Sequence, residues 1–364
     1  MARKLIKGCE AIGEAAVQAG CKLFFGYPIT PQTEILEYMS RRLPQVGGTF
    51  VQAESEVAAS NMIYGAAGTG ERAMTASSSP GISLMMEAVS YLAGAELPAV
   101  IVNVMRAGPG LGGILPGQAD YYQATKGGGH GDYHCLVLAP WSAQEAADLM
   151  RDAFDLSDFY RNPVMVLCDG LIGQIMEPVE FHADRPPCQP SAPKTWATTG
   201  WRGDRPRAII NSLYLDPEAL EKHNQALQAK YEAMARNEVR CAEVGMEAPY
   251  ELLIVAYGSA ARVCATALGA LKAQGVAAAL CRPITLFPFP YAEVRRAAEQ
   301  AKAVLVVELS AGQMIEDVRL AVEGRRPIHF LGRQGGMLVM PQDVAEKAAG
   351  VARLLLEAVE GNRG

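Results

Sequence analysis

Six short segments in the first half of the chain are apolar on both faces and are separated by stretches with helical periodicity. Strands of a parallel sheet have this composition, because helices cover both faces of the sheet. Residues 1–180 are therefore predicted to form a doubly wound α/β domain. The predicted strands are Lys22–Gly26, Thr49–Gln52, Arg72–Ala76, Ala99–Met105, Cys135–Ala139 and Val164–Asp169.

The composition changes at about residue 178, and from there to Pro206 it is rich in Pro, Thr, Trp and Arg and has no periodicity. We predict that residues 181–248 form a linker with one helix, which begins at Asp216-Pro217-Glu218 and ends near Arg240. A second βα series follows, so residues 249–364 are expected to form a further α/β domain. Its predicted strands are Leu252–Tyr257, Val276–Arg282, Ala303–Glu308 and Ile328–Leu331.

Charge and cysteine usage exclude several classes of protein. The net charge is −6 and no basic block occurs, which argues against a nucleic-acid partner. No apolar run is long enough for a membrane span, and the N-terminus lacks the apolar core of a signal peptide, so a cytoplasmic location is expected. The eight cysteines and five histidines are scattered, so we expect no metal or iron–sulfur ligands on this chain.

The turn Gly26-Tyr27-Pro28-Ile29-Thr30-Pro31 follows the first predicted strand. Thr30 has two compatible interpretations. It is typical of an N-cap before a proline at the first helical position. A capped helix end at the carboxyl edge of a sheet is also suited to bind an anion such as a carboxylate.

Two acids, Glu54 and Glu56, follow the second predicted strand. Since they are two residues apart, they point to roughly opposite sides of a helix, and one of them is expected to be a solvated first-turn acid. Spacing does not decide which. Arg106 follows the strand Ala99–Met105, and is either a surface residue or a bidentate partner for a carboxylate.

The glycine-rich stretch Gly108–Gly113 matches the pattern G-x-G-x-x-G, but Pro116 and Gly117 prevent a helix from starting there. We therefore reject a dinucleotide site and expect a flexible active-site loop. The segment Lys126–Asp132 is interpreted in the same way, and His130 within it is only a weak candidate for a proton carrier.

Four motifs together resemble the alpha subunit of the 2-oxoacid:ferredoxin oxidoreductases, and the resemblance covers essentially the whole chain. They are Gly26–Pro31, Glu54–Glu56, Ser78–Gly81 and Gly108–Gly110. The C-terminal part resembles a transketolase C-terminal domain. Within the family the chain is most similar to the 2-oxoisovalerate (3-methyl-2-oxobutanoate) type, and the 2-oxoglutarate type is the near alternative.

The resemblance implies that residues 1–180 are a pyrimidine-binding domain for thiamine diphosphate. It implies that Glu56, not Glu54, hydrogen-bonds the aminopyrimidine ring and so activates the cofactor for attack on the 2-oxo carbon. Thr30 and Arg106 are then expected to hold the substrate's carboxylate end. The further residues expected at the cofactor are Pro28, Ile29, Ser79 and Gly81.

The implied reaction is oxidative decarboxylation of a 2-oxoacid to an acyl-coenzyme A, with electrons passed to ferredoxin. The diphosphate and its Mg²⁺ are expected on a beta subunit, and the iron–sulfur clusters on ferredoxin-like gamma and delta subunits. A different class of function is a non-catalytic scaffold of such a complex. The two differ in whether Glu56 and Thr30 face a cleft shared with a partner.

Overall fold

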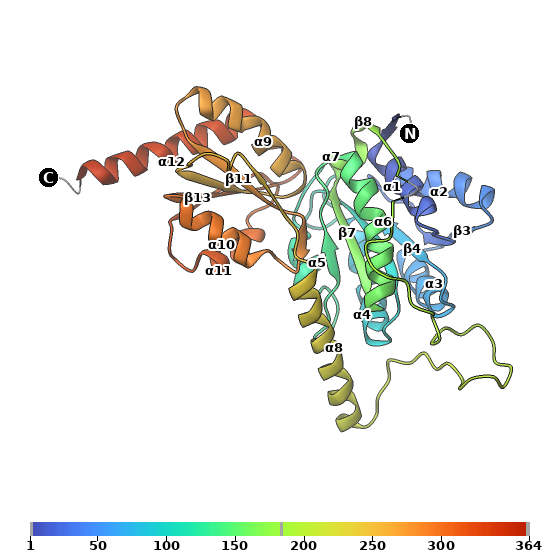
Figure 1. Cartoon of the computed structure of the whole chain (residues 1–364). Coiled ribbons are helices and arrows are strands. Elements are labelled where there is room, and N and C mark those ends of the chain that lie inside the picture. Colours follow the sequence, from blue (N-terminus) through green and yellow to red (C-terminus); the bar gives the residue numbers. More distant parts are fainter. Residues whose placement is uncertain (1–2, 183–184, 362–364) are drawn as a thin grey trace.

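The structure is a computed structural model that describes residues 3–182 and 185–361. Residues 1–2, 183–184 and 362–364 lie outside this description. They include the first two residues of the N-terminal segment, which was predicted not to be a signal peptide, and the last three residues of the predicted C-terminal domain. Figure 1 shows an N-terminal α/β unit, a long extended linker and a C-terminal α/β unit. In the described part of the chain, no helix combines the length and apolarity needed to cross a bilayer.

The described N-terminal half is built on a seven-stranded sheet with the order β12-β6-β7-β5-β4-β2-β3. The six strands from the first half pair in parallel, which confirms the doubly wound fold class. Four of them are buried at every position, as helices on both faces require. The strands are β2 (Leu23–Gly26), β3 (Thr49–Gln52), β4 (Ala73–Ser77), β5 (Ala99–Met105), β6 (Leu136–Leu138), β7 (Pro163–Asp169) and β12 (Thr285–Phe287).

Helices cover both faces of this sheet. Helix α6 begins with one half of a capping box, in which the Ser142 side chain accepts from the Glu145 N–H. The Glu145 carboxylate accepts from the Trp141 N–H, and not from that of Ser142 as a full capping box requires. The helices are α1 (Gly8–Gln18), α2 (Thr33–Gln45), α3 (Glu56–Gly68), α4 (Ser79–Gly94), α5 (Tyr121–Thr125), α6 (Ala143–Tyr160) and α7 (Gly170–Gln174).

A small antiparallel pair closes the N-terminal unit on one side. Strand β1 (Lys4–Lys7) pairs with β8 (Met176–Val179). The change in composition that was noted at about residue 178 starts within β8, because Pro178 lies at the edge of this pair, where a proline is tolerated.

The order of the strands creates a switch point next to β2. From β2 the chain moves outward to β3, then crosses back to β4 and continues in the opposite direction. Beyond the carboxyl ends of the strands on either side of such a point lies the crevice in which doubly wound sheets bind ligands. The segments that follow β2, β3, β4 and β5 all start at this edge.

The C-terminal unit contains a five-stranded sheet with the order β14-β13-β10-β11-β9, in which the edge strand β9 runs antiparallel. Neither β9 nor α11 was predicted from the sequence. The strands are β9 (Cys241–Val244), β10 (Leu252–Val255), β11 (Ala278–Pro283), β13 (Ala303–Glu308) and β14 (Ile328–Gly332). The helices are α8 (Pro217–Asn237), α9 (Gly258–Ala273), α10 (Tyr291–Gln300), α11 (Met314–Val322) and α12 (Pro341–Gly361).

The two units are joined by more than the linker. Strand β12 belongs to the C-terminal half of the chain but pairs antiparallel with β6, where Thr285 lies opposite Leu138. The sequence predicted parallel strands only, whereas this sheet also contains one antiparallel strand. Its last strand is supplied by the segment that leaves β11, whose Ile284 carbonyl accepts from the Ala139 N–H.

A buried carboxylate links the units at a second point. Asp317 of α11 is 1% exposed and accepts hydrogen bonds from the hydroxyl of Tyr121 at 2.6 Å and from that of Tyr291. The Lys126 ammonium lies 2.6 Å from the same carboxylate. Tyr121 and Lys126 belong to the N-terminal unit. The charge of Asp317, in the C-terminal unit, is therefore compensated in part by groups of the N-terminal unit, and we call this contact between the two units the joint.

Asp317→Ala is expected to lower the free energy of unfolding by about 2–4 kcal/mol, because two tyrosine hydroxyls, of which that of Tyr121 is buried, and one ammonium lose their shared acceptor. Lys126 is partly exposed and can turn to solvent, which limits the loss. The measurement is urea denaturation followed by circular dichroism. Asp204→Ala, at an exposed position of the linker, serves as the control. An unchanged midpoint for Asp317→Ala would show that the joint does not depend on this carboxylate.

Candidate active site

The predicted site residues come from four consecutive strand ends at the switch point. Thr30 follows β2, Glu56 is the first residue of α3 after β3, and Arg106 follows β5 directly. Ser79 and Gly81 lie in the first turn of α4, after β4. Because the neighbouring strands run parallel, the segments that follow them all start at one edge of the sheet. In the sequence these residues span 77 positions, from Thr30 to Arg106.

The structure separates the two acids that spacing left equivalent. Glu54 is exposed, whereas Glu56 is buried with 6% of its surface accessible. Ser55 has an extended backbone and its hydroxyl accepts from the Ala58 N–H at 3.2 Å, so it caps α3. Because the serine does this, the Glu56 carboxyl is not needed as a cap and is available for another partner.

Glu56 packs directly on a glycine of the neighbouring helix. A Cβ atom at Gly81 would lie 2.5 Å from Oε1 of Glu56 and 2.1 Å from Oγ of Ser77. Only a residue without a side chain allows this approach. The hydroxyls of Ser77 and Ser78 are fully buried and have no hydrogen-bond partner within the described residues. The carboxyl therefore lies near at least one polar group, the Ser77 hydroxyl, that the described residues do not satisfy.

Arg106 connects three parts of the site. Its guanidinium donates to the Thr30 carbonyl at 3.0 Å and to the Leu111 carbonyl at 3.1 Å. Its backbone N–H and carbonyl both bond the hydroxyl of Ser79. The side chain is 8% exposed, and Nε has no partner within the described residues. Because carbonyls hold it, the positive charge remains available to an anion.

Thr30 is not the N-cap that the sequence indicated. Helix α2 begins at Thr33 with Gln32 at the cap position, and the Gln32 N–H closes a turn onto the Ile29 carbonyl at 2.9 Å. The residue before a proline is disfavoured in helical conformation, and the Thr30 carbonyl is bonded to Arg106. The Thr30 side chain is exposed, while Pro28 and Ile29 are half-buried.

A closed loop follows Arg106. The Ala107 N–H donates to the Leu115 carbonyl at 2.9 Å and Arg106 forms a bridge with Pro116, so the residues between them project from a narrow neck. Gly112 has φ +58°, which suits glycine. No helix starts within this loop, as expected when the dinucleotide motif was rejected; α5 begins only at Tyr121.

A polar pair beside Ser79 was not predicted from the sequence. The Asn103 amide donates to the Asp120 carboxylate at 2.9 Å, and the Ser79 side chain is within hydrogen-bonding contact of the same carboxylate. Burial raises the pKa of Asp120, and these two hydrogen bonds oppose the shift. A fully buried asparagine within an otherwise apolar strand was the signal that could have revealed the pair.

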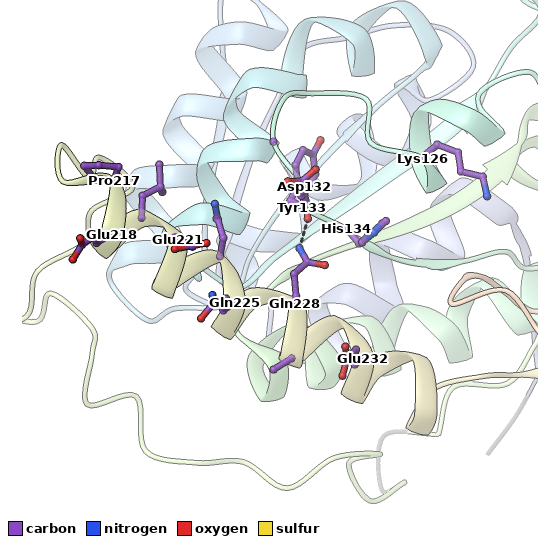
Figure 2. Close-up of a pocket in the computed structure, with 14 residues that line it drawn as sticks. Lys126, Asp132, Tyr133, His134, Pro217, Glu218, Glu221, Gln225, Gln228 and Glu232 are labelled. Carbon is purple, nitrogen blue, oxygen red and sulfur yellow. Dashed lines mark hydrogen bonds between the residues drawn. The ribbon is translucent and has the colours of Figure 1, made fainter.

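A groove of about 1070 Å³ lies elsewhere, between α8 and the loop that contains Asp132 (Figure 2). The Gln228 side chain donates to the Asp132 carbonyl across it. Four acids and one lysine line this groove, so it disfavours an anion such as a 2-oxoacid or a diphosphate. These charged residues are Asp132, Glu218, Glu221, Glu232 and Lys126.

His130 lies away from the four strand ends. Its ring makes an edge contact with Tyr91, in the last turn of α4, whereas Gly81 is in the first. Its carbonyl accepts from the Ser90 hydroxyl. Across the described residues, no three side chains of the types His, Cys, Asp and Glu are grouped so as to hold a metal ion.

Comparison with known families divides the chain into two matching regions. Residues 14–242 match the family described as pyruvate flavodoxin/ferredoxin oxidoreductase, thiamine diphosphate-binding. Residues 250–344 match core domain II of pyruvate:ferredoxin oxidoreductase. The four strand ends described above all lie within the first match.

Full-length relatives are found among oxidoreductase subunits of archaea. The chain is 50% identical to the ketoisovalerate oxidoreductase subunit VorB of Methanothermobacter marburgensis, over 97% of this chain and 99% of that protein. It is 37% identical to the 2-oxoglutarate synthase subunit KorA of Methanothermobacter thermautotrophicus, over 93% of this chain and 96% of that protein.

A solved structure supports the same grouping. The chain superposes on 2-oxoglutarate:ferredoxin oxidoreductase from Magnetococcus marinus, with 2-oxoglutarate, coenzyme A and succinyl-CoA bound, with a TM-score of 0.87 and 26% identity. The superposition covers 96% of this chain and 65% of the solved chain, so this chain spans about two thirds of that protein. A split-gene transketolase shares the fold alone, at a TM-score of 0.56 and 13% identity. The family predicted from the sequence motifs is confirmed: the chain belongs to the 2-oxoacid:ferredoxin oxidoreductases, as a subunit with a thiamine diphosphate-binding domain.

Proposed function

We propose that this chain is the alpha subunit of a ferredoxin-dependent oxidoreductase that converts 3-methyl-2-oxobutanoate to its acyl-coenzyme A. The bond between the carboxylate and the carbonyl carbon breaks, CO₂ leaves, and the carbonyl carbon forms a thioester with coenzyme A. Two electrons pass to two ferredoxins and one proton is released. The observation that carries the chemistry is the buried Glu56 carboxyl packed on Gly81 at the switch point of the sheet.

The residues present fit the pyrimidine part of thiamine diphosphate. Glu56 offers a buried carboxyl, and the glycine at position 81 keeps backbone instead of a side chain beside it. The unpartnered hydroxyls of Ser77 and Ser78 add polar groups at the same strand end. Pro28 and Ile29 would supply apolar contact to the ring. When bound, the cofactor supplies a carbon nucleophile and accepts the electron pair released with CO₂.

The chain's own residues then have distinct tasks. Glu56 holds a proton at its carboxyl oxygens, in a hydrogen bond to a ring nitrogen of the cofactor. Arg106 and the Thr30 hydroxyl bind the carboxylate end of the 2-oxoacid. Ser79 positions Arg106 through the two bonds to its backbone, and so links the substrate side of the site to helix α4.

The proposal assigns the rest of the machinery to partner chains. A beta subunit would hold the diphosphate and its Mg²⁺, and gamma and delta subunits would carry the iron–sulfur clusters. The scattered cysteines support this division, since six of the eight are buried in the structure. The choice of a branched substrate is supported by the higher identity to ketoisovalerate than to 2-oxoglutarate subunits.

The test is a substrate panel on the complex that copurifies with this chain. Coenzyme A-dependent ferredoxin reduction would be measured with 3-methyl-2-oxobutanoate, 2-oxoglutarate and pyruvate. We expect kcat/KM to be at least about tenfold higher for 3-methyl-2-oxobutanoate than for 2-oxoglutarate, because a site that takes an apolar branched side chain offers no cationic partner to a second carboxylate.

Two other outcomes of this test would change the proposal. A preference for 2-oxoglutarate would keep the reaction and replace the substrate, and it is the second candidate because the solved neighbour binds 2-oxoglutarate. An assembled complex that turns over a 2-oxoacid equally well with Glu56→Gln would identify this chain as a scaffold.

A further inference from the structure

Gln118 is a buried side chain that ties the N-terminal unit to the C-terminal unit. It is 0% exposed. Its Oε1 accepts from the Leu309 N–H at 2.9 Å, and its Nε2 donates to the Tyr257 carbonyl at 3.0 Å and to the Asp169 carboxylate at 3.3 Å. Its own N–H donates to the Leu309 carbonyl, and its carbonyl accepts from the Tyr257 hydroxyl. Every polar atom of Gln118 is thus bonded.

The partners of Gln118 lie at the ends of strands and helices. Leu309 directly follows β13, and Tyr257 directly precedes α9, so both stand at the carboxyl edge of the C-terminal sheet. Asp169 also accepts from the Ser259 N–H at 2.9 Å. Since a buried amide is costly unless it is fully hydrogen-bonded, this arrangement permits one position of Gln118 relative to the C-terminal unit.

Gln118 is also two residues beyond the neck of the loop that follows Arg106. One side of this neck is Arg106, which Ser79 ties to helix α4. The other side is Pro116, which continues through Gly117 into Gln118. A Cβ atom at Gly117 would lie 3.2 Å from Cα of Ala107, so the two sides of the neck are in close contact.

A second contact joins the loop to the C-terminal unit. A Cβ atom at Gly336 would lie 2.6 Å from Cβ of Leu115, so the backbone after β14 packs on the Leu115 side chain. Leu115 is nevertheless 57% exposed. The loop is therefore held from the C-terminal side at Leu115 and at Gln118, and from the N-terminal side at Arg106.

We propose that Gln118 is a positioning residue through which the C-terminal unit sets the place of Arg106 relative to Thr30. This inference rests on the proposed function, in which Arg106 binds the carboxylate of the 2-oxoacid. The C-terminal unit then contributes to substrate binding without touching the substrate, because it holds the far side of the neck from which Arg106 projects.

The first test is Gln118→Met in the assembled complex, which keeps the length of the side chain and removes its hydrogen bonds. We expect KM for the 2-oxoacid to rise about tenfold while kcat falls less than about threefold, as for a substrate-binding group moved slightly out of place. Gln144→Met is the matched control. Gln144 also bonds a distant backbone, at both N–H and carbonyl of Glu180, but this contact lies within the N-terminal unit, directly after β8. The KM of Gln144→Met for the 2-oxoacid should equal that of the wild type.

Leu115→Ala tests the same inference without risk to the buried joint, because Leu115 is largely exposed. It removes Cγ and the atoms beyond it, which make part of the other contact between the loop and the C-terminal unit, and is expected to raise KM in the same direction. If Gln118→Met does not assemble, this variant decides. An unchanged KM in Leu115→Ala and in any assembled Gln118→Met would overturn the inference.

A double-mutant cycle with Arg106→Met identifies the route of the effect. We expect Gln118→Met to add no further rise in KM once Arg106 is gone, because the two act through one contact. An equal factor in both backgrounds would show that Gln118 acts elsewhere. If Arg106→Met alone leaves KM unchanged, the proposed role of Arg106 fails, and this result is distinct from failure of the positioning role.

Hydrogen–deuterium exchange gives a readout that is independent of turnover. In Gln118→Met the amides of Gly108–Leu115 should exchange faster than in the wild type and in Gln144→Met. Unchanged exchange in this loop, with KM also unchanged, would show that the neck is held without Gln118.

Discussion

Glu56→Gln is expected to lower kcat for coenzyme A-dependent ferredoxin reduction by a factor of about 10²–10⁴, the usual contribution of a positioned acid–base group. The glutamine keeps the shape of the side chain and its packing on Gly81. It can still form a hydrogen bond, but it cannot give up and regain a proton. The loss should therefore appear in kcat, while KM for the 2-oxoacid changes little.

Glu54→Gln is the matched control for this result. It makes the same chemical change two residues earlier, on an exposed side chain, and should leave turnover unchanged. Calorimetric titration of both variant complexes with thiamine diphosphate checks that the cofactor still binds. Equal losses in the two variants would contradict the assignment of Glu56, and so would wild-type turnover in Glu56→Gln.

Gly81→Ala is expected to reduce kcat by roughly 10–100-fold, because even a small displacement of a catalytic group is costly. The added methyl group would lie 2.1 Å from Ser77 Oγ and 2.5 Å from Glu56 Oε1. One of these side chains has to move, and that of Glu56 is the longer. Alanine is otherwise the better residue within a helix, so the loss would come from the site and not from the helix.

Gly269→Ala provides the comparison for this substitution. Gly269 lies within α9, is exposed, and has open space where its Cβ would be. There alanine should raise the free energy of unfolding by about 0.5–1 kcal/mol and leave turnover unchanged. Thermal denaturation and steady-state kinetics of the two variants measure both effects. Full activity in Gly81→Ala would show that the close approach of Glu56 to α4 is not required.

The parallel strands were predictable because their signal is local. A strand buried on both faces is apolar at most positions, and β5 and β13, which are of this kind, have the predicted bounds. So does β3, although its two ends are exposed. Strand β12 had no such signal. It is three residues long, lies in a proline-rich stretch, and pairs with a strand about 150 positions earlier in the sequence. Its existence depends on how the two units pack.

Thr30 shows a local signal that was misleading. Threonine before proline is typical of a helix start, but α2 begins at Thr33. The Thr30 carbonyl instead accepts from Arg106, 76 positions later in the sequence. A contact of that range competes with the local preference, and propensity rules contain no information about it.

By itself, the sequence determined the fold class, the four strand ends that carry the candidate residues, and the family. Each of these depends on residue types and short motifs, which are visible without coordinates. Only the tertiary structure decided that Glu56 is buried while Glu54 is exposed, and that Gln118 and Asp317 join the two units. Burial and long-range hydrogen bonds depend on which segments meet in space, and hydrophobic periodicity reports only which side of its own segment a residue occupies.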